Sequence, residues 1–153
     1  MNQLKLMYYK SILLQIKRGS NRGVISNAKP IFIISIFDAI SKGIVEENKI
    51  NFSIEEIKSI YIDNYSQYAH LEKKTPFYMP FYHLSSEGFW HLQWNDGYPL
   101  TTVAHTPSAK YLRDNVKYGT LDNALWDLLQ DAQARTILRE TVINHFLKTE
   151  NKK

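Results

Sequence analysis

The sequence predicts an α+β fold that is mainly α-helical, with one small antiparallel β-hairpin. Long stretches carry apolar residues at helical spacing, and only one short segment clearly alternates as a strand does. At 153 residues, of which 44% are hydrophobic, the chain is long enough to bury one compact core. We therefore predict a single domain over residues 1–148, followed by a frayed polar tail over residues 149–153.

The first two helices are predicted from apolar spacing and from residues that start or stop helices. A helix over residues 2–18 has apolar residues at i, i+4 spacing, and Gly19 suits the C′ position after it. A second helix begins near Lys29 and Pro30 and ends near Gly43. Because this second helix is apolar on several faces, we expect it to be central and largely buried.

A third helix and a rigid aromatic segment are predicted for the middle of the chain. Ser53 followed by Glu56 forms a capping box for a helix that runs to about His70. The two prolines within residues 75–80 fix φ and remove backbone donors. We therefore expect this segment to be neither a helix nor a central strand.

The hairpin and the C-terminal helices complete the predicted fold. Residues 89–94 alternate as a strand, an Asn-Asp-Gly turn follows, and residues 98–103 form the return strand. A further helix opens with Thr106 as N-cap and Pro107 at its first position. Residues 119–122 then interrupt the pattern before the last helices.

Charge is distributed unevenly along the chain. The formal net charge is +4, and no acidic residue occurs before Asp38. The basic residues of that first stretch are Lys5, Lys10, Lys17, Arg18, Arg22 and Lys29. Such asymmetry predicts one basic face, which favours a polyanionic partner through counterion release. An ordinary solvated helix surface is the alternative.

Composition and motif searches restrict the function classes. The chain has no cysteine, which excludes a disulfide scaffold and cysteine-ligated zinc and fits the cytoplasm. The longest apolar run, residues 31–37, is too short for a membrane span. No signature of a nucleotide-binding loop, a zinc protease or a serine hydrolase occurs. His83, Asn95 and His105 loosely resemble the order of an HNH nuclease but lack its acidic context, so we expect no catalytic residue, no metal and no cofactor.

The densest motif is an aromatic block. It reads Thr-Pro-Phe-Tyr-Met-Pro-Phe-Tyr-His-Leu over residues 75–84 and Gly-Phe-Trp-His-Leu-Gln-Trp over residues 88–94. This block resembles the Pro-Phe-aromatic-(His or Arg)-Leu signature, and the Gly-Leu/Phe-Trp-x-Leu strand after it, of DNA sulfur-recognition domains. Many members of that family carry arginine where His83 stands.

Other segments resemble the same family, so that the resemblance spans about residues 5 to 147. They are the segment at 27–36 with its Lys-Pro-apolar run, the segment at 117–122 with its Gly-x-Leu pattern and the helical residues 126–129 after it, and the closing helix at 142–146. Family members read phosphorothioate-modified double-stranded DNA and are usually fused to an HNH nuclease in bacterial-type restriction defence. The resemblance implies a non-enzymatic DNA-binding module, either a domain of a larger nuclease or a stand-alone reader that directs a separate one.

The chemistry of a phosphorothioate indicates which residues suit its recognition. Sulfur is larger, more polarisable and less strongly hydrated than oxygen, so an apolar dimple accepts sulfur and disfavours oxygen. With the resemblance in view, we expect Pro107 and Ala109 to contact sulfur, beside Thr106 and with His83 and His105 as polar walls. From the residues alone, Pro107 also fits an ordinary first-turn proline, and His83 fits a core histidine. Contacts with the DNA backbone and bases are expected from Arg22, Lys29, Tyr78, Tyr82, Ser108, Lys110 and Arg113.

Two alternatives from other classes remain open. One is a non-catalytic protein-interaction domain that uses the aromatic loop as a binding hot spot. The other is a small metal-dependent nuclease that uses His83 and His105.

Of the aromatic residues in the block, we expect four in the core: Phe77, Phe81, Phe89 and Trp90.

Overall fold

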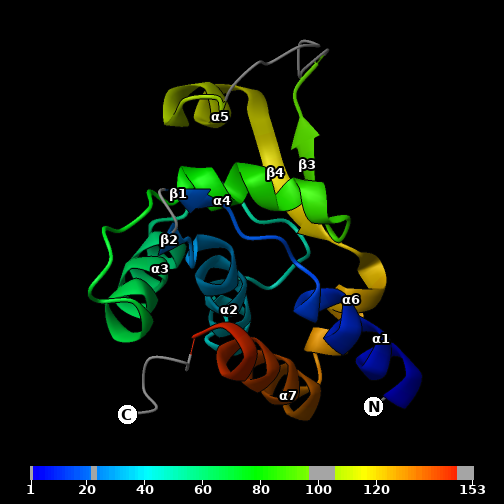
Figure 1. Cartoon of the computed structure of the whole chain (residues 1–153). Coiled ribbons are helices and arrows are strands. Elements are labelled where there is room, and N and C mark those ends of the chain that lie inside the picture. Colours follow the sequence, from blue (N-terminus) through cyan, green and yellow to red (C-terminus); the bar gives the residue numbers. More distant parts are fainter. Residues whose placement is uncertain (1, 22–23, 97–105, 148–153) are drawn as a thin grey trace.

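Helix α2 (Ala28–Ser41) is the central element of the computed structural model, which describes residues 2–21, 24–96 and 106–147 (Figure 1). Eleven of its 14 residues are buried, because the helix is apolar on every face and must be covered on every side. Helices α3 (Glu55–Tyr68), α4 (Tyr78–His83) and α7 (Ala132–Val142) pack against it. The prediction of a central, buried second helix is confirmed.

The predicted fold class, α+β and mainly helical, is also confirmed. The described residues contain two antiparallel two-stranded ladders, one of them very short. The remaining elements are α1 (Gln3–Leu14), β1 (Ser20–Asn21), β2 (Val24–Ile25), a 3-10 turn (Leu84–Glu87), β3 (Trp90–Trp94), α5 (Ala109–Asn115), β4 (Val116–Leu121), α6 (Asn123–Leu129) and a final π-helical turn (Ile143–Leu147). The tail over residues 149–153 lies outside the described residues. Within the described ranges, no helix has the length and apolar character needed to cross a membrane.

Helix α1 ends earlier than predicted. The Asn2 side chain caps its start by accepting from the Lys5 N–H, but the helix stops at Leu14 and Gly19 is not its C′ residue. Beyond the end of the helix, the Lys17 backbone N–H donates to the Glu87 carboxylate at 3.0 Å and not to a helix carbonyl. The segment after α1 is thus held by a residue far along the chain.

The start of α3 also differs from the prediction. Ser53 is not a cap, since its own backbone N–H donates to the Asn51 side chain at 2.8 Å. Ile54 precedes the first helical residue and makes no side-chain cap hydrogen bond. An Asx turn has therefore replaced the predicted capping box.

Helix α4 contradicts the prediction that residues 75–80 cannot be helical. Tyr78 begins the helix and Pro80 is its third residue. The first N–H groups of a helix have no partner within the helix, so a proline there sacrifices no hydrogen bond. The prolines of this segment therefore set where α4 starts.

Strand β3 pairs with β4, a segment predicted in part as an interruption between helices. The register places Trp90 opposite Leu121 and Leu92 opposite Gly119. The predicted return strand, residues 98–103, lies outside the described residues. At the base of the ladder, the Trp90 indole N–H donates to the Phe81 carbonyl at 2.7 Å, which fixes β3 against α4.

The two strands are joined by a long connection whose ends are held together. The Asn95 N–H donates to the Asn115 carbonyl at 2.8 Å, and the Asn95 side chain donates to the Asp114 carbonyl at 3.1 Å. Figure 1 shows β3, β4 and α5 standing out together from the helical body.

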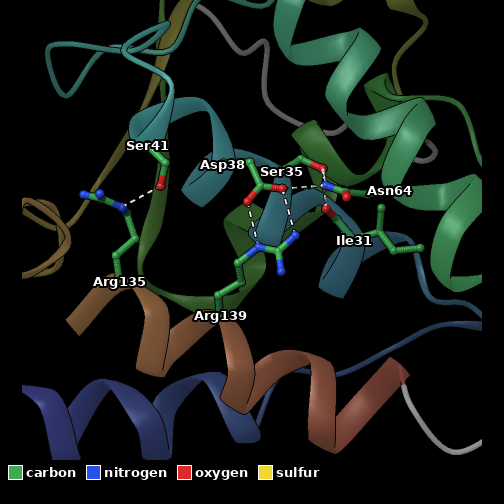
Figure 2. Close-up of polar contacts among 7 residues, drawn as sticks. All are labelled: Ile31, Ser35, Asp38, Ser41, Asn64, Arg135 and Arg139. Atoms are coloured by element: carbon green, nitrogen blue, oxygen red, sulfur yellow. Dashed lines mark hydrogen bonds and ion pairs between the residues drawn. The ribbon is translucent and has the colours of Figure 1, made fainter. Parts of the chain in front are cut away.

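A polar cluster ties α2 to α3 and α7 (Figure 2). Two guanidinium nitrogens of Arg139 donate to the Asp38 carboxylate at 2.7 and 3.0 Å. The Asn64 amide donates to Asp38 and to the Ser35 hydroxyl, each at 3.0 Å. Ser35 in turn donates to the Ile31 carbonyl at 2.7 Å. The polar side chains of this interior are therefore paired with one another.

Gly119 offers a stringent test of the β3–β4 packing. A Cβ atom at this position would lie 2.2 Å from Cζ2 of the Trp90 ring, which is fully buried. We expect Gly119→Ala to lower the free energy of unfolding by about 2 kcal/mol through overpacking. Urea denaturation at constant m-value measures the change.

The matched control is Gly19→Ala, where a Cβ atom would meet nothing within 4 Å. Neither glycine has a left-handed φ, so backbone strain does not enter the comparison. Equal stability of the two variants would contradict the packing described for Trp90.

Candidate nucleic-acid interface

Two segments of the predicted site meet at His83 and Thr106. His83 is the last residue of α4, and Thr106 lies just before α5, which packs against α4. The His83 Nε2 and Thr106 Oγ1 atoms are 2.7 Å apart, a hydrogen bond between residues separated by 23 positions. Side chains that the sequence resemblance assigned to one site are thus in direct contact.

This contact changes how α5 begins. Thr106 was predicted to be the N-cap of this helix, and that prediction is wrong, because the Thr106 hydroxyl is hydrogen-bonded to His83. The Ser108 hydroxyl instead accepts from the Tyr111 N–H at 3.1 Å, and the helix starts at Ala109. Pro107 therefore precedes the helix instead of opening it, and its side chain is buried.

The environment of His83 favours the neutral imidazole. Partial burial of the ring, and secondarily the positive charge of Lys29, lower the pKa of His83 below its ordinary value. Lys29 is itself bound to Glu87 at 2.6 Å, with only 14% and 10% of the two side chains exposed. The positive charge of Lys29 near His83 is therefore already paired with a carboxylate.

A groove of about 890 Å³ opens beside His83. Its apolar lining comes from the start of α2 and from α4, where Ala28, Met79 and Pro80 contribute. Lys73 and Lys74, both exposed, supply positive charge from the segment between α3 and α4. The complete lining is Gly19, Ser26, Ala28, Lys29, Leu71, Glu72, Lys73, Lys74, Thr75, Pro76, Met79, Pro80 and His83.

The segment that carries the two lysines is held by hydrogen bonds at several points. The Asn27 amide donates to Glu72, and Arg18 donates to Asn27 at 2.8 Å. The Tyr65 hydroxyl donates to the Thr75 hydroxyl at 3.1 Å. The groove wall is therefore organised before any ligand arrives, which reduces the entropy lost on binding.

The other predicted contact residues lie outside this groove or outside the described residues. Lys110 pairs with Asp114 at 2.7 Å on the exposed face of α5, and Arg113 is exposed on the same helix. Ala109 is half-buried. Tyr78 and Tyr82 are half-buried on α4, and Arg22 and His105 fall outside the described residues.

Three residues that line the groove were not singled out from the sequence, namely Lys73, Lys74 and Met79. A signal was present, since the two lysines directly precede the segment that was predicted to be rigid. Only the aromatic residues of the segment at 75–84 were considered, so the two lysines before it were overlooked.

Most aromatic residues of the block are structural. Phe81, Phe89 and Trp90 are buried, as predicted, and Phe77 is half-buried against the same core. The ring centroids of Phe81 and Trp90 lie 5.5 Å apart in an edge-to-face arrangement. Over the ranges that the structure describes, no group of three or more histidine or acidic side chains is arranged to hold a metal ion.

Comparison with known proteins adds no assignment: no protein-family model matches the chain, and no curated protein sequence is significantly similar to it.

The pKa of His83 tests the electrostatics of the site. We expect His83 to titrate below the ordinary histidine value of about 6.5 in the free protein. Lys29→Met removes the smaller, electrostatic cause and should raise this pKa, while burial keeps it below the ordinary value. NMR titration of the imidazole signals measures both values, with His83→Gln to assign the resonance. A wild-type pKa at or above about 6.5 would contradict this description.

Proposed function

We propose that this chain is a cytoplasmic DNA-binding module that recognises a phosphorothioate linkage in double-stranded DNA and directs a fused or separate nuclease to it. The observation that supports this most is the His83–Thr106 hydrogen bond. It joins, beside a groove rimmed by lysines, two segments that the resemblance to sulfur-recognition domains had assigned to one pocket.

In this proposal the groove holds the DNA backbone next to the modified linkage. Lys73 and Lys74 are exposed on its rim and suit phosphate oxygens, since each neutralised phosphate releases counterions. From the sequence, Lys29 was expected to contact DNA directly, but in this proposal its contribution is smaller. Its charge is paired with Glu87, so a phosphate would have to share it.

The sulfur atom would lie between His83 and the segment at 106–109. His83 keeps part of its ring exposed there, and Ala109 offers a half-exposed methyl group. An apolar contact of this kind favours sulfur because an oxygen in the same place loses hydrogen bonds to water, at a cost of about 1–3 kcal/mol. Pro107, being buried, would support this surface from behind.

An anion beside His83 should also couple binding to pH. A negative charge stabilises the imidazolium, so the pKa of His83 is expected to be higher in the complex than in the free protein. Binding then strengthens as pH falls through the interval between the two pKa values. This coupling supports a direct test of whether the ligand reaches His83.

The sulfur preference is tested with three duplexes of one sequence, which carry sulfur in either configuration or none. We expect the wild-type chain to bind one configuration at least about tenfold more tightly than the unmodified duplex. Ala109→Ser should reduce the difference in affinity between the modified and the unmodified duplex, because the serine hydroxyl can hydrogen-bond to a phosphate oxygen. Fluorescence anisotropy measures the affinities. The matched control is Ala124→Ser, at a half-buried alanine of α6, which should leave the difference in affinity unchanged. Equal affinity of the wild-type chain for all three duplexes would overturn the sulfur proposal.

The backbone contacts are tested through salt dependence. With roughly three to five phosphate contacts, log K should fall against log salt with a slope of about −3 to −5. Lys73→Ala/Lys74→Ala should reduce this slope by about two and weaken modified and unmodified DNA alike. Lys5→Ala/Lys10→Ala removes two lysines from α1 and serves as the control, with a much smaller change. A wild-type slope near zero would indicate that the chain is a protein-interaction domain, and metal-dependent cleavage lost in His83→Gln would indicate a nuclease.

A further inference from the structure

Helix α1 is apolar on two opposite faces. Its inner face buries Leu6, Tyr9 and Leu13, where the helix packs on α6 and α7. Its outer face bears large apolar side chains that remain in solvent, namely Leu4 (79% exposed), Met7 (63%), Tyr8 (58%) and Leu14 (37%). Within the described residues, no other element covers this outer face, so burial in the core does not explain it.

The exposed residues form one continuous stripe. Steps of three and four along α1 connect Leu4, Met7, Ser11 and Leu14, so these side chains lie on the same side of the helix. A hollow of about 420 Å³ runs along the stripe between Met7, Lys10, Ser11, Leu14 and Gln15. The stripe therefore offers a shaped apolar surface.

Neighbouring groups hold some of the side chains on this outer face. The Tyr8 ring rests edge-on against the buried Tyr9 ring, with centroids 5.0 Å apart. The Gln15 amide donates to the Ser11 hydroxyl at 3.0 Å. Side chains held in this way lose less entropy when a partner covers them.

Charge indicates what kind of partner fits. At 100° per residue, Lys10 borders one edge of the stripe and Lys5 the other, and the helix contains no acidic residue. A second copy that packed its own α1 against this face would bring lysines against lysines. An acidic partner would instead place carboxylates beside both lysines.

We propose that the outer face of α1 is a docking surface for an acidic amphipathic helix of a partner protein. The 12 residues of α1 span about 18 Å, which matches three turns of a partner helix laid along the stripe. Ser11 and Gln15 lie within the stripe and can hydrogen-bond to a partner helix, but not to lipid tails, so the surface suits a protein better than a membrane.

This surface is separate from the groove. Helix α1 packs on α6 and α7, whereas the groove is formed by α2, α4 and the segment at 71–76 (Figure 1). Docking on α1 therefore leaves the groove open, and the proposal does not depend on DNA binding.

The test uses a synthetic peptide of about 20 residues with leucines at i, i+3, i+4 and i+7 and glutamates flanking them. A second peptide has lysines in place of the glutamates. We expect saturable binding of the acidic peptide in fluorescence anisotropy, weakened by salt, and at least about tenfold weaker binding of the lysine peptide.

Variants locate the binding surface. Met7→Gln/Leu14→Gln should weaken the acidic peptide at least about tenfold, because two anchors no longer bury apolar area. Lys5→Glu/Lys10→Glu should reverse the preference toward the lysine peptide. Ile62→Gln, at an exposed isoleucine of α3, is the matched control and should leave the affinity unchanged. All these positions are exposed, so the variants are expected to fold, which circular dichroism checks.

Several outcomes would overturn the proposal. One is equal binding of both peptides, and another is full retention of binding in Met7→Gln/Leu14→Gln. A dimer in sedimentation that this double variant abolishes would assign the face to a second copy of the chain. Binding to anionic lipid vesicles, without binding to the acidic peptide, would assign it to a membrane surface.

Discussion

Helix α2 cannot face water on any side, and the need to cover it places the surrounding helices. Its residues are apolar around the whole circumference, from Ile31 to Ile40. Burial of such a helix removes a large apolar area from water, since eleven of its residues are buried. The groove is a by-product of this arrangement, since it forms where α4 and the segment before it cross the start of α2.

Polar side chains among these packed helices need hydrogen-bond partners, and they form hydrogen bonds with one another. Asp38 receives Arg139 from α7 and Asn64 from α3. The Asp38 hydrogen bond also raises the pKa of Arg139. Because each of these contacts depends on side-chain direction, the cluster specifies how α3 and α7 are rotated about α2, which apolar contacts alone specify less sharply.

Features set by short stretches of sequence were predictable, and features set by distant contacts were not. The burial of α2 follows from its own apolar pattern, and its start near Lys29 and Pro30 follows from the proline. The contact of Lys17 with Glu87 just after α1 joins residues far apart in the sequence, and the pairing of β4 depends on a glycine that leaves room for Trp90. Pro80 was misjudged because its effect depends on where in a helix it stands.

The candidate site also contains features that local sequence predicts and features that depend on distant contacts. His83 could be singled out from its motif, but its hydrogen bond to Thr106 required the fold. The assignment of Thr106 as a helix cap was wrong, because a local cap signal competed with a tertiary contact. The lysines of the groove rim were passed over, since two adjacent lysines in a loop are ordinary surface until the fold places a hollow beside them.

The closed ends of the connection between β3 and β4 have an evolutionary consequence. Asn95 binds the backbone at Asp114 and Asn115, so the chain leaves and re-enters the body at one point. The connection can differ in length between Asn95 and Thr106 without moving either strand or the His83–Thr106 contact, and doubling the length of a loop costs only about 0.6 kcal/mol of closure entropy. Homologous chains can therefore differ in length and sequence between Asn95 and Thr106, whereas residues 106–115 are constrained because they contact His83 and pack against α4.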